Sequence, residues 1–268
     1  MTSERGHVQI GECRLAYRID GDGPALLLVH AGIADGRMWN PQIGAFAEHY
    51  RVIRPDLRGY GETVRPDEPH ANHADLQALL EHLDAEQAAV VGASMGGAAA
   101  LDLCLEYPEL VERLVLVCSA LGGHESEDPW LAQKWKEAED AYEGGDPAAA
   151  ARIEMETWLA GPQRSLGDLS PDVVDRLRRM LLRSYELDVE VEELELSPPA
   201  SARLAEIAAP TLVLSGAGDV TGMQRTADRI AEGIRDAEKR VLDDCAHLPN
   251  MECPADFNRV VLDFLGRS

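Results

Sequence analysis

Unbroken runs of apolar residues alternate along the chain with segments of helical spacing. The clearest runs cover residues 25–29, 88–91, 113–118 and 210–215. A run without polar breaks is typical of a strand that is buried on both faces of a parallel sheet. Because helical segments separate these runs, the pattern predicts an α/β fold, with a mostly parallel sheet flanked by helices.

The ends of this pattern are more irregular. Residues 8–10 and 13–18 alternate in polarity around Gly11, which predicts an antiparallel hairpin. The spacing of apolar residues predicts shorter strands at 50–54 and 239–242 and helices at 72–84 and 98–106.

Strand-like runs disappear between about residues 121 and 202. Helical spacing replaces them at 129–142, 146–159 and 170–184. Ser170 followed by Pro171 is a typical start for the last of these helices. We therefore expect an α/β core built from residues 1–121 and 203–268, with residues 122–202 inserted as a helical cap.

Composition restricts the class of protein and its partners. The 268 residues are 45% hydrophobic, enough for one large α/β domain, and the formal net charge is −23. That charge argues against nucleic acid and anionic membranes as partners. No apolar stretch reaches 18 residues, and the first residues lack a basic start and apolar run, so a cytoplasmic protein is expected. The five cysteines form no C-x-x-C pair, so we expect no structural disulfides and no zinc site.

The most specific motif is the pentapeptide Gly92-Ala93-Ser94-Met95-Gly96, a G-x-S-x-G pattern. It lies between a predicted strand and a predicted helix, which is the context in which the motif carries chemistry. The small residues on either side allow a tight, strained turn that exposes the serine hydroxyl. Ser94 is therefore the candidate nucleophile.

A nucleophilic serine needs a base, and the base needs an orienting carboxylate. Asp219 follows the strand at 210–215, and His247 follows the strand at 239–242, so both are expected at the same sheet edge as Ser94. In the fold that carries this motif, the serine comes first along the chain, the acid second and the histidine third, and these three residues follow that order. Asp243 and Asp244, close to His247, are the competing acids.

An oxyanion hole requires two backbone N–H groups near the nucleophile. Met95, the residue after Ser94, is expected to supply one of them. The loop after the first apolar run is expected to supply the other, from Gly32 or, failing that, from Ile33. We expect His30 to brace this loop through hydrogen bonds rather than to act as the base.

These segments together resemble the α/β-hydrolase superfamily, in its capped esterase, lactonase and haloperoxidase-like branch. The matching segments are His30-Ala31-Gly32, Asp56-Leu57-Arg58-Gly59-Tyr60-Gly61, Gly92-Ala93-Ser94-Met95-Gly96, Gly216-Ala217-Gly218-Asp219 and residues 246–254. The resemblance implies that Asp56 and Arg58 hold loops near the site. Ala31 stands where the family usually has glycine, and residues 30–39 also resemble the enol-lactonase branch.

The expected function is hydrolysis of small carboxylic esters by Ser94, His247 and Asp219 through an acyl-enzyme. A serine suits attack on an acyl carbon, whereas relatives that attack alkyl carbons use aspartate at this position. Hydrolysis of an enol-lactone or of a carbon–carbon bond remains open, as does a ligand sensor without turnover. The expected partner is a small-molecule ester or lactone; no cofactor, metal, nucleic acid or membrane is expected, and the sequence leaves the oligomeric state open.

The acidic insert also predicts a substrate preference. Its negative charge is expected to slow esters that bear a free carboxylate. An arginine in the pocket, such as Arg37 or Arg152, would reverse this preference by pairing with the carboxylate.

Overall fold

The strands of the protein form a single sheet. The structure is a computed structural model and describes residues 3–124, 128–187, 191 and 193–266. Within these residues the sheet has eight strands in the order β1-β2-β4-β3-β5-β6-β7-β8. The strands are β1 (Ser3–Ile10), β2 (Cys13–Asp20), β3 (Ala25–Val29), β4 (Arg51–Pro55), β5 (Ala88–Ala93), β6 (Val111–Val117), β7 (Thr211–Gly216) and β8 (Ala237–Leu242).

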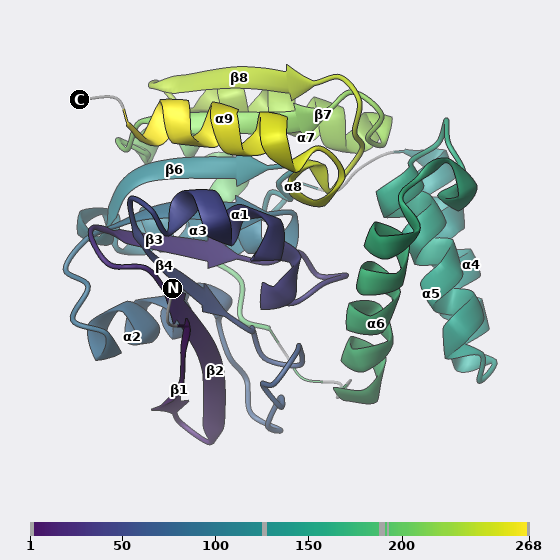
Figure 1. The fold of residues 1–268 in the computed structure, drawn as a ribbon, viewed down its shortest axis with the longest axis horizontal. Helices are drawn as coiled ribbons and strands as arrows, with labels where there is room; N and C mark the ends of the chain where they lie inside the picture. The colour runs from purple at the N-terminus through teal and green to yellow at the C-terminus, as the bar shows by residue number, and fades with distance from the viewer. Residues whose placement is uncertain (1–2, 125–127, 188–190, 192, 267–268) are drawn as a thin grey trace.

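The sheet is mostly parallel, as predicted. Strand β2 pairs antiparallel with β1 and with β4, and each remaining pair is parallel. The carboxyl ends of the parallel strands therefore share one edge. In Figure 1 this edge faces the helices α4, α5 and α6 on the right. Loops that follow different strands can meet there, which makes this edge the place for a site.

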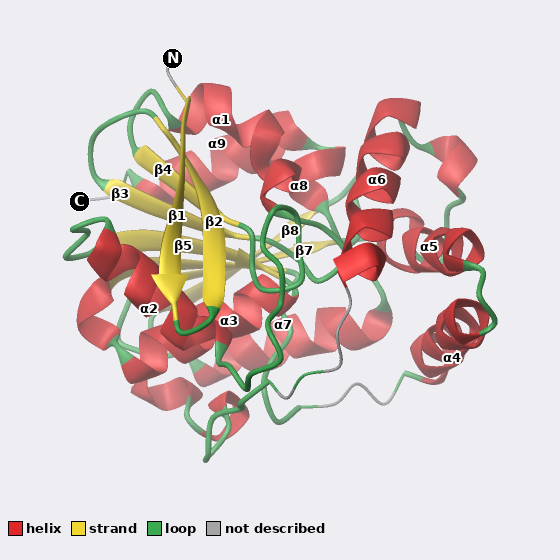
Figure 2. Ribbon diagram, turned by 90° about the horizontal axis from the view of Figure 1, so that it is seen from below, coloured by secondary structure: helices red, strands yellow, loops and turns green. Residues whose placement is uncertain are grey.

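Helices cover both faces of the sheet. The described α-helices are α1 (Asn40–Phe46), α2 (Asn72–His82), α3 (Met95–Glu106), α4 (Pro129–Glu143), α5 (Pro147–Met155), α6 (Pro171–Leu187), α7 (Thr221–Gly233), α8 (Pro249–Glu252) and α9 (Pro254–Leu265). Figure 2 shows α1, α8 and α9 on one side of the strands and α2, α3 and α7 on the other. None of the described helices is long and apolar enough to cross a membrane.

Each face of the sheet has its own hydrophobic core, because successive side chains of a strand point to opposite faces. In β3, Leu26 and Leu28 belong to the core beneath α1 and α9, whereas Leu27 and Val29 belong to the core beneath α2 and α3. All four are fully buried. This explains why the strand reads as an unbroken apolar run.

The helices predicted between β6 and β7 are present. Helix α5 packs against both α4 and α6. A short π-helical segment, Glu156–Ala160, continues α5. Leu131, Trp158 and Leu177 from these helices are buried in the same core as one face of the sheet. The division into a core and a cap at residues 122–202 stays a prediction.

The turn between β5 and α3 has the strained backbone that the motif predicts. Ser94 has φ 51° and ψ −116°, which is unusual for a residue with a side chain. A Cβ atom at Gly92 would collide with the carbonyl oxygen of Gly96. A Cβ atom at Gly96 would lie 2.5 Å from the Val29 carbonyl oxygen and would also collide with that of His30. Only glycine therefore lets α3 approach β3 this closely.

We predict that Gly96→Ala destabilises the fold, because the colliding atoms are backbone oxygens that cannot rotate away. The expected loss is about 3 kcal/mol in the free energy of unfolding, seen as a lower melting temperature in calorimetry. Gly44→Ala is the matched control, since Gly44 lies exposed in α1 with no atom within 4 Å of a new Cβ. It should leave the melting temperature unchanged or raise it. Equal melting temperatures for wild type and Gly96→Ala would contradict the steric argument.

Candidate active site

Ser94 stands between the end of β5 and the first turn of α3. Its backbone N–H donates to the Val117 carbonyl oxygen at 2.9 Å, and its own carbonyl oxygen accepts the Ala120 N–H at 3.0 Å. These bonds tie the turn to the end of β6. The side chain is half-buried and lines a cavity. The hydroxyl is thus held at the start of a helix, where developing negative charge is favoured.

Asp219 and His247 form the hydrogen-bonded pair that the sequence predicts. The ring nitrogen Nδ1 of His247 lies 2.9 Å from Asp219 Oδ2 and 3.1 Å from Oδ1. Both side chains are buried. The Val220 N–H also donates to Asp219 Oδ1, at 2.7 Å. Because the carboxylate accepts a hydrogen bond from Nδ1, the proton is held on that nitrogen. The Nε2 nitrogen of His247 is then left as an acceptor.

The competing acids are placed elsewhere. Asp243 and Asp244 are exposed and line a separate small cavity beside Arg164.

Among the hydrogen bonds of the described residues, none joins the Ser94 hydroxyl to His247. Such bonds are often long before substrate binds and shorten in the complex.

Trp158, in the segment that follows α5, packs on the candidate base. Its ring centroid lies 4.5 Å from that of His247, at an interplanar angle of 41°. Its carbonyl oxygen accepts the His247 backbone N–H at 3.2 Å. This residue of the insert therefore positions the histidine, a role that the sequence analysis did not assign.

Glu252 holds the loop on both sides of His247. Its carboxylate accepts the Ala246 N–H at 3.0 Å and the Leu248 N–H at 3.3 Å. Arg164 pairs with the same carboxylate at 2.6 Å. Burial raises the pKa of Glu252, while Arg164 opposes that rise. The loop that carries His247 is thus fixed by one buried carboxylate, and the sequence analysis also missed this role.

The two candidate oxyanion donors lie next to each other. A Cβ atom at Gly32 would lie 3.4 Å from the sulfur of Met95. His30 braces this loop, as predicted: the Leu57 N–H donates to its Nε2 at 2.9 Å, and its Nδ1 donates to the Ala31 carbonyl at 2.9 Å. Burial lowers the pKa of His30, and the Nε2 nitrogen that accepts the Leu57 N–H carries no proton. A buried ring with both nitrogens engaged is not available as a base.

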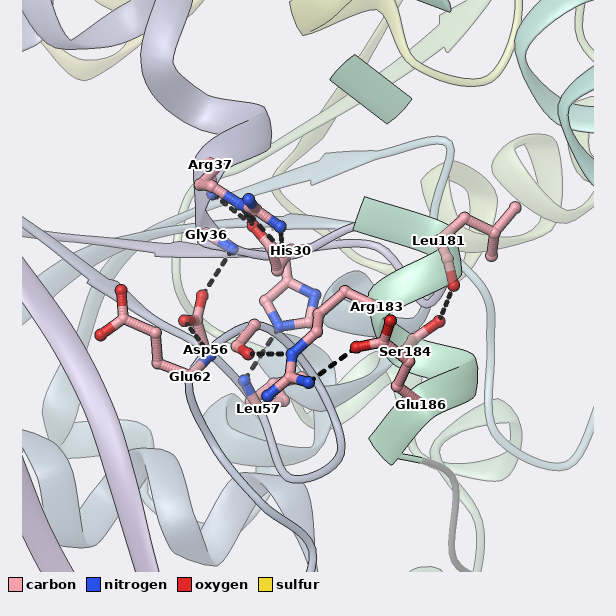
Figure 3. Close-up of polar contacts among 12 residues, drawn as sticks. His30, Gly36, Arg37, Asp56, Leu57, Glu62, Leu181, Arg183, Ser184 and Glu186 are labelled. Atoms are coloured by element: carbon pink, nitrogen blue, oxygen red, sulfur yellow. Dashed lines mark hydrogen bonds and ion pairs between the residues drawn. The ribbon is translucent and has the colours of Figure 1, made fainter. Parts of the chain in front are cut away.

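Asp56 and Arg58 hold loops, as the family resemblance implies. The Asp56 carboxylate accepts the N–H of Gly36, from a separate segment, at 2.8 Å and the N–H of Glu62, in its own loop, at 2.9 Å, and Figure 3 shows both bonds. Arg58 makes two bonds to the buried Asp75, at 2.6 Å and 2.8 Å. These contacts anchor the segment that flanks Gly32.

An apolar cavity opens beside Ser94, with a volume of about 690 Å³. We call it the apolar cavity; it is lined by Ser94, Met95, Ala98, Ala120, Leu121, His124, Leu131, Ala132, Trp135, Trp158, Met223 and Thr226. Most of these side chains are hydrocarbon, aromatic or thioether groups. A substrate group that fills this cavity would be apolar.

Neither arginine that the sequence suggested for the pocket lines the apolar cavity. Arg37 is held by the Asp35 carboxylate, at 2.8 Å and 2.6 Å. Arg152 lies on the surface and pairs with Glu156, four residues along the chain, at 2.8 Å. No lysine or arginine is found among the described residues that line this cavity.

Cys118 lies behind the histidine–aspartate pair. Its sulfur and the ligand-type atoms of Asp219 and His247 all lie within 4.8 Å of one another. In the part of the chain that the structure describes, this is the one group with spacing suited to a metal ion. The Cys118 S–H donates to the Ala246 carbonyl oxygen at 3.7 Å, and burial raises the pKa of this thiol well above its ordinary value. The geometry therefore fits a protonated thiol packed against the pair.

Comparisons with known proteins agree with this geometry. The family model described as "alpha/beta hydrolase fold" matches residues 24–254. A curated relative from Paraburkholderia xenovorans is 30% identical over 95% of this chain and 91% of its own length. It is named a 2-hydroxy-6-oxononadienedioate/2-hydroxy-6-oxononatrienedioate hydrolase.

Two solved structures are also similar. A hydrolase from Pseudomonas aeruginosa PA01 has a TM-score of 0.81 and 30% identity, over 98% of both chains. An enol-lactonase from Burkholderia xenovorans LB400 has a TM-score of 0.80 and 26% identity, over 97% of this chain and all of its own. The likeness thus extends over almost the whole chain, including the residues between β6 and β7.

We predict that Glu252→Ala loosens the loop around His247. The N–H groups of Ala246 and Leu248 lose their acceptor, so their amide hydrogens should exchange on the order of tenfold faster in hydrogen-exchange NMR. Glu232→Ala, which removes an exposed carboxylate of α7, should leave both rates unchanged. If these two amides exchange at the wild-type rate in Glu252→Ala, the carboxylate does not hold the loop.

Proposed function

The chain belongs to the family with the alpha/beta hydrolase fold, and on that premise we propose that it is a serine hydrolase that cleaves small carboxylic esters, lactones included. The observation that carries this proposal is the buried Asp219–His247 pair, at the sheet edge where Ser94 begins α3. A paired histidine with a free Nε2 has the form that a general base requires.

The mechanism follows from these positions. The Ser94 Oγ attacks the ester carbonyl carbon while His247 Nε2 takes the hydroxyl proton. The carbonyl oxygen becomes an oxyanion, which the N–H groups of Gly32 and Met95 would bind. His247 then gives the proton to the leaving alcohol, which leaves Ser94 acylated. Water attacks the acyl-enzyme by the same route, and Asp219 stabilises the imidazolium in both steps.

We assign the segment 122–202 the role of a cap. Leu131, Ala132 and Trp135 of α4 line the apolar cavity, and Trp158 lies between this cavity and His247. A cover of this kind keeps bulk water from the reacting atoms and shapes the space for the substrate. The apolar lining supports a substrate with an uncharged hydrocarbon or aromatic arm.

Cleavage of a carbon–carbon bond is the second candidate, because the curated relative is named for such a substrate. That name describes a dioate, a molecule with two carboxylates. The described residues lining the apolar cavity include no lysine or arginine to pair with a carboxylate there. Burying an unpaired carboxylate is costly, so this observation favours a substrate whose arm in the apolar cavity is uncharged.

We predict that Ser94→Ala lowers kcat for a neutral phenylalkanoate ester by roughly 10⁴ and leaves the melting temperature near that of the wild type. The loss arises because no oxygen nucleophile remains at the elbow. Steady-state kinetics with several turnovers measures it. Full ester turnover by the variant would remove Ser94 from the mechanism, and a single turnover by the wild type would favour a ligand sensor instead.

We also predict that Asp219→Asn lowers kcat by about 10⁴, with a much smaller change in KM. The variant keeps the shape of the side chain but loses the charge that orients the ring and stabilises the imidazolium. Asp244→Asn is the matched control, since Asp244 is exposed and does not contact the ring. If Asp244→Asn were the inactive variant and Asp219→Asn the active one, the acid would have been assigned to the wrong residue.

A further inference from the structure

A second cavity adjoins the proposed oxyanion hole on the side of Gly32. Its volume is about 200 Å³. We call it the polar cavity; it is lined by Gly32, Gly59, Tyr60, Arg65, Glu154, Leu181, Ser184 and Tyr185. Helices α5 and α6 supply half of this lining, and the loops after β3 and β4 supply the rest.

The apolar and polar cavities share a boundary at Met95. Met95 lines the apolar cavity, and its sulfur lies 3.4 Å from the position of a Cβ atom at Gly32, which lines the polar cavity. The Tyr60 hydroxyl donates to the same sulfur at 3.7 Å. Because Gly32 and Met95 are the proposed oxyanion donors, a reacting carbonyl would lie between the two cavities. The two arms of a substrate would then meet different surroundings.

The polar cavity presents hydrogen-bond acceptors from α5 and α6, the Glu154 carboxylate among them. The Ser184 hydroxyl donates to the Leu181 carbonyl at 2.8 Å, a bond within α6 that Figure 3 shows. The Tyr185 hydroxyl donates to Glu154 Oε1 at 2.8 Å. The Ser184 hydroxyl has one hydrogen, so its oxygen can still accept a hydrogen bond from a ligand. Arg65 donates hydrogen bonds from Nε and Nη2 to the Arg58 carbonyl oxygen, at 3.3 Å and 3.0 Å.

Glu154 is the strongest acceptor of this set. A carboxylate offers about four lone-pair positions, and Tyr185 occupies one of them. No ion pair joins Glu154 to a lysine or arginine among the described residues. Burial raises the pKa of Glu154, with the Tyr185 hydroxyl opposing that rise. A partly buried carboxylate without a cation is complementary to a ligand that donates a hydrogen bond.

We propose that the polar cavity binds a substrate arm carrying a hydroxyl or N–H donor, and that Glu154 is the residue that selects this arm. The proposal rests on the proposed ester hydrolysis at Ser94. It makes the substrate asymmetric, with an apolar arm on one side of the scissile carbonyl and a neutral, donor-bearing arm on the other.

The test compares esters that differ only by a methyl group replaced with a hydroxyl. One pair is the n-propyl and hydroxyethyl esters of phenylpropanoic acid, which places the change on the alcohol arm. The other pair is the phenylpropyl esters of butanoic acid and β-hydroxypropanoic acid, which places it on the acyl arm. The readout is the ratio of kcat/KM for the hydroxyl ester to that for the methyl ester.

For wild type we expect this ratio to reach about tenfold or more in one pair, since a hydrogen bond to a charged group has that effect. Glu154→Met keeps the length of the side chain but removes the acceptor, and should reduce the ratio to about one or below. Glu154→Gln keeps one acceptor oxygen, so its ratio should lie between those two values. Glu156→Gln, which removes a neighbouring charge that pairs with Arg152, should leave both the ratio and the activity unchanged.

The proposal is overturned if wild type prefers the methyl ester in both pairs. It is equally overturned if the preference survives in a folded Glu154→Met variant, or in Glu154→Gln should the first variant not fold.

Calorimetric binding of the same esters to Ser94→Ala separates this proposal from the proposed function. A hydroxyl preference in binding without turnover by wild type would support the polar cavity and contradict ester hydrolysis. Turnover without any preference would do the reverse.

Discussion

The close approach of α3 to β3 is the constraint on which the rest of the site depends. It requires glycine at position 96, whose missing Cβ leaves room for the carbonyl oxygens of Val29 and His30. The same turn holds Ser94 at a positive φ and places Met95 against Gly32. The position of the proposed nucleophile, of both proposed oxyanion donors and of the boundary between the two cavities therefore depends on one backbone contact.

The histidine side of the site is built on a different principle. Here buried polar groups form hydrogen bonds with one another. Asp219 accepts a hydrogen bond from His247, and Glu252 accepts hydrogen bonds from the residues before and after His247. A buried carboxylate is stable only when its hydrogen bonds are made, so each fixes the loop it binds. Trp158 completes this arrangement and links it to the helices between β6 and β7.

Much of the fold could be predicted because its signals are local. Apolar runs marked the buried strands, and the G-x-S-x-G motif marked the elbow at Ser94 with its strained backbone. The pairing of Asp219 with His247 followed from strand-end positions. Glu252 and Glu154 were missed because their roles arise from contacts that distant segments make after folding. Arg152 was considered as an arginine that could enter the pocket, but it pairs with Glu156, four residues along the chain, a partner that the sequence already offers.

In the proposed mechanism Ser94 carries the acyl group during the reaction. This role is tested most directly by mixing the enzyme with a slowly deacylated aryl ester, quenching in acid within the first turnover, and mapping the peptides by mass spectrometry. We expect the mass of the acyl group on the peptide that contains Ser94, in an amount matching the initial burst of released phenol. Hydrolysis with no burst, and with every peptide unmodified at all quench times, would contradict it.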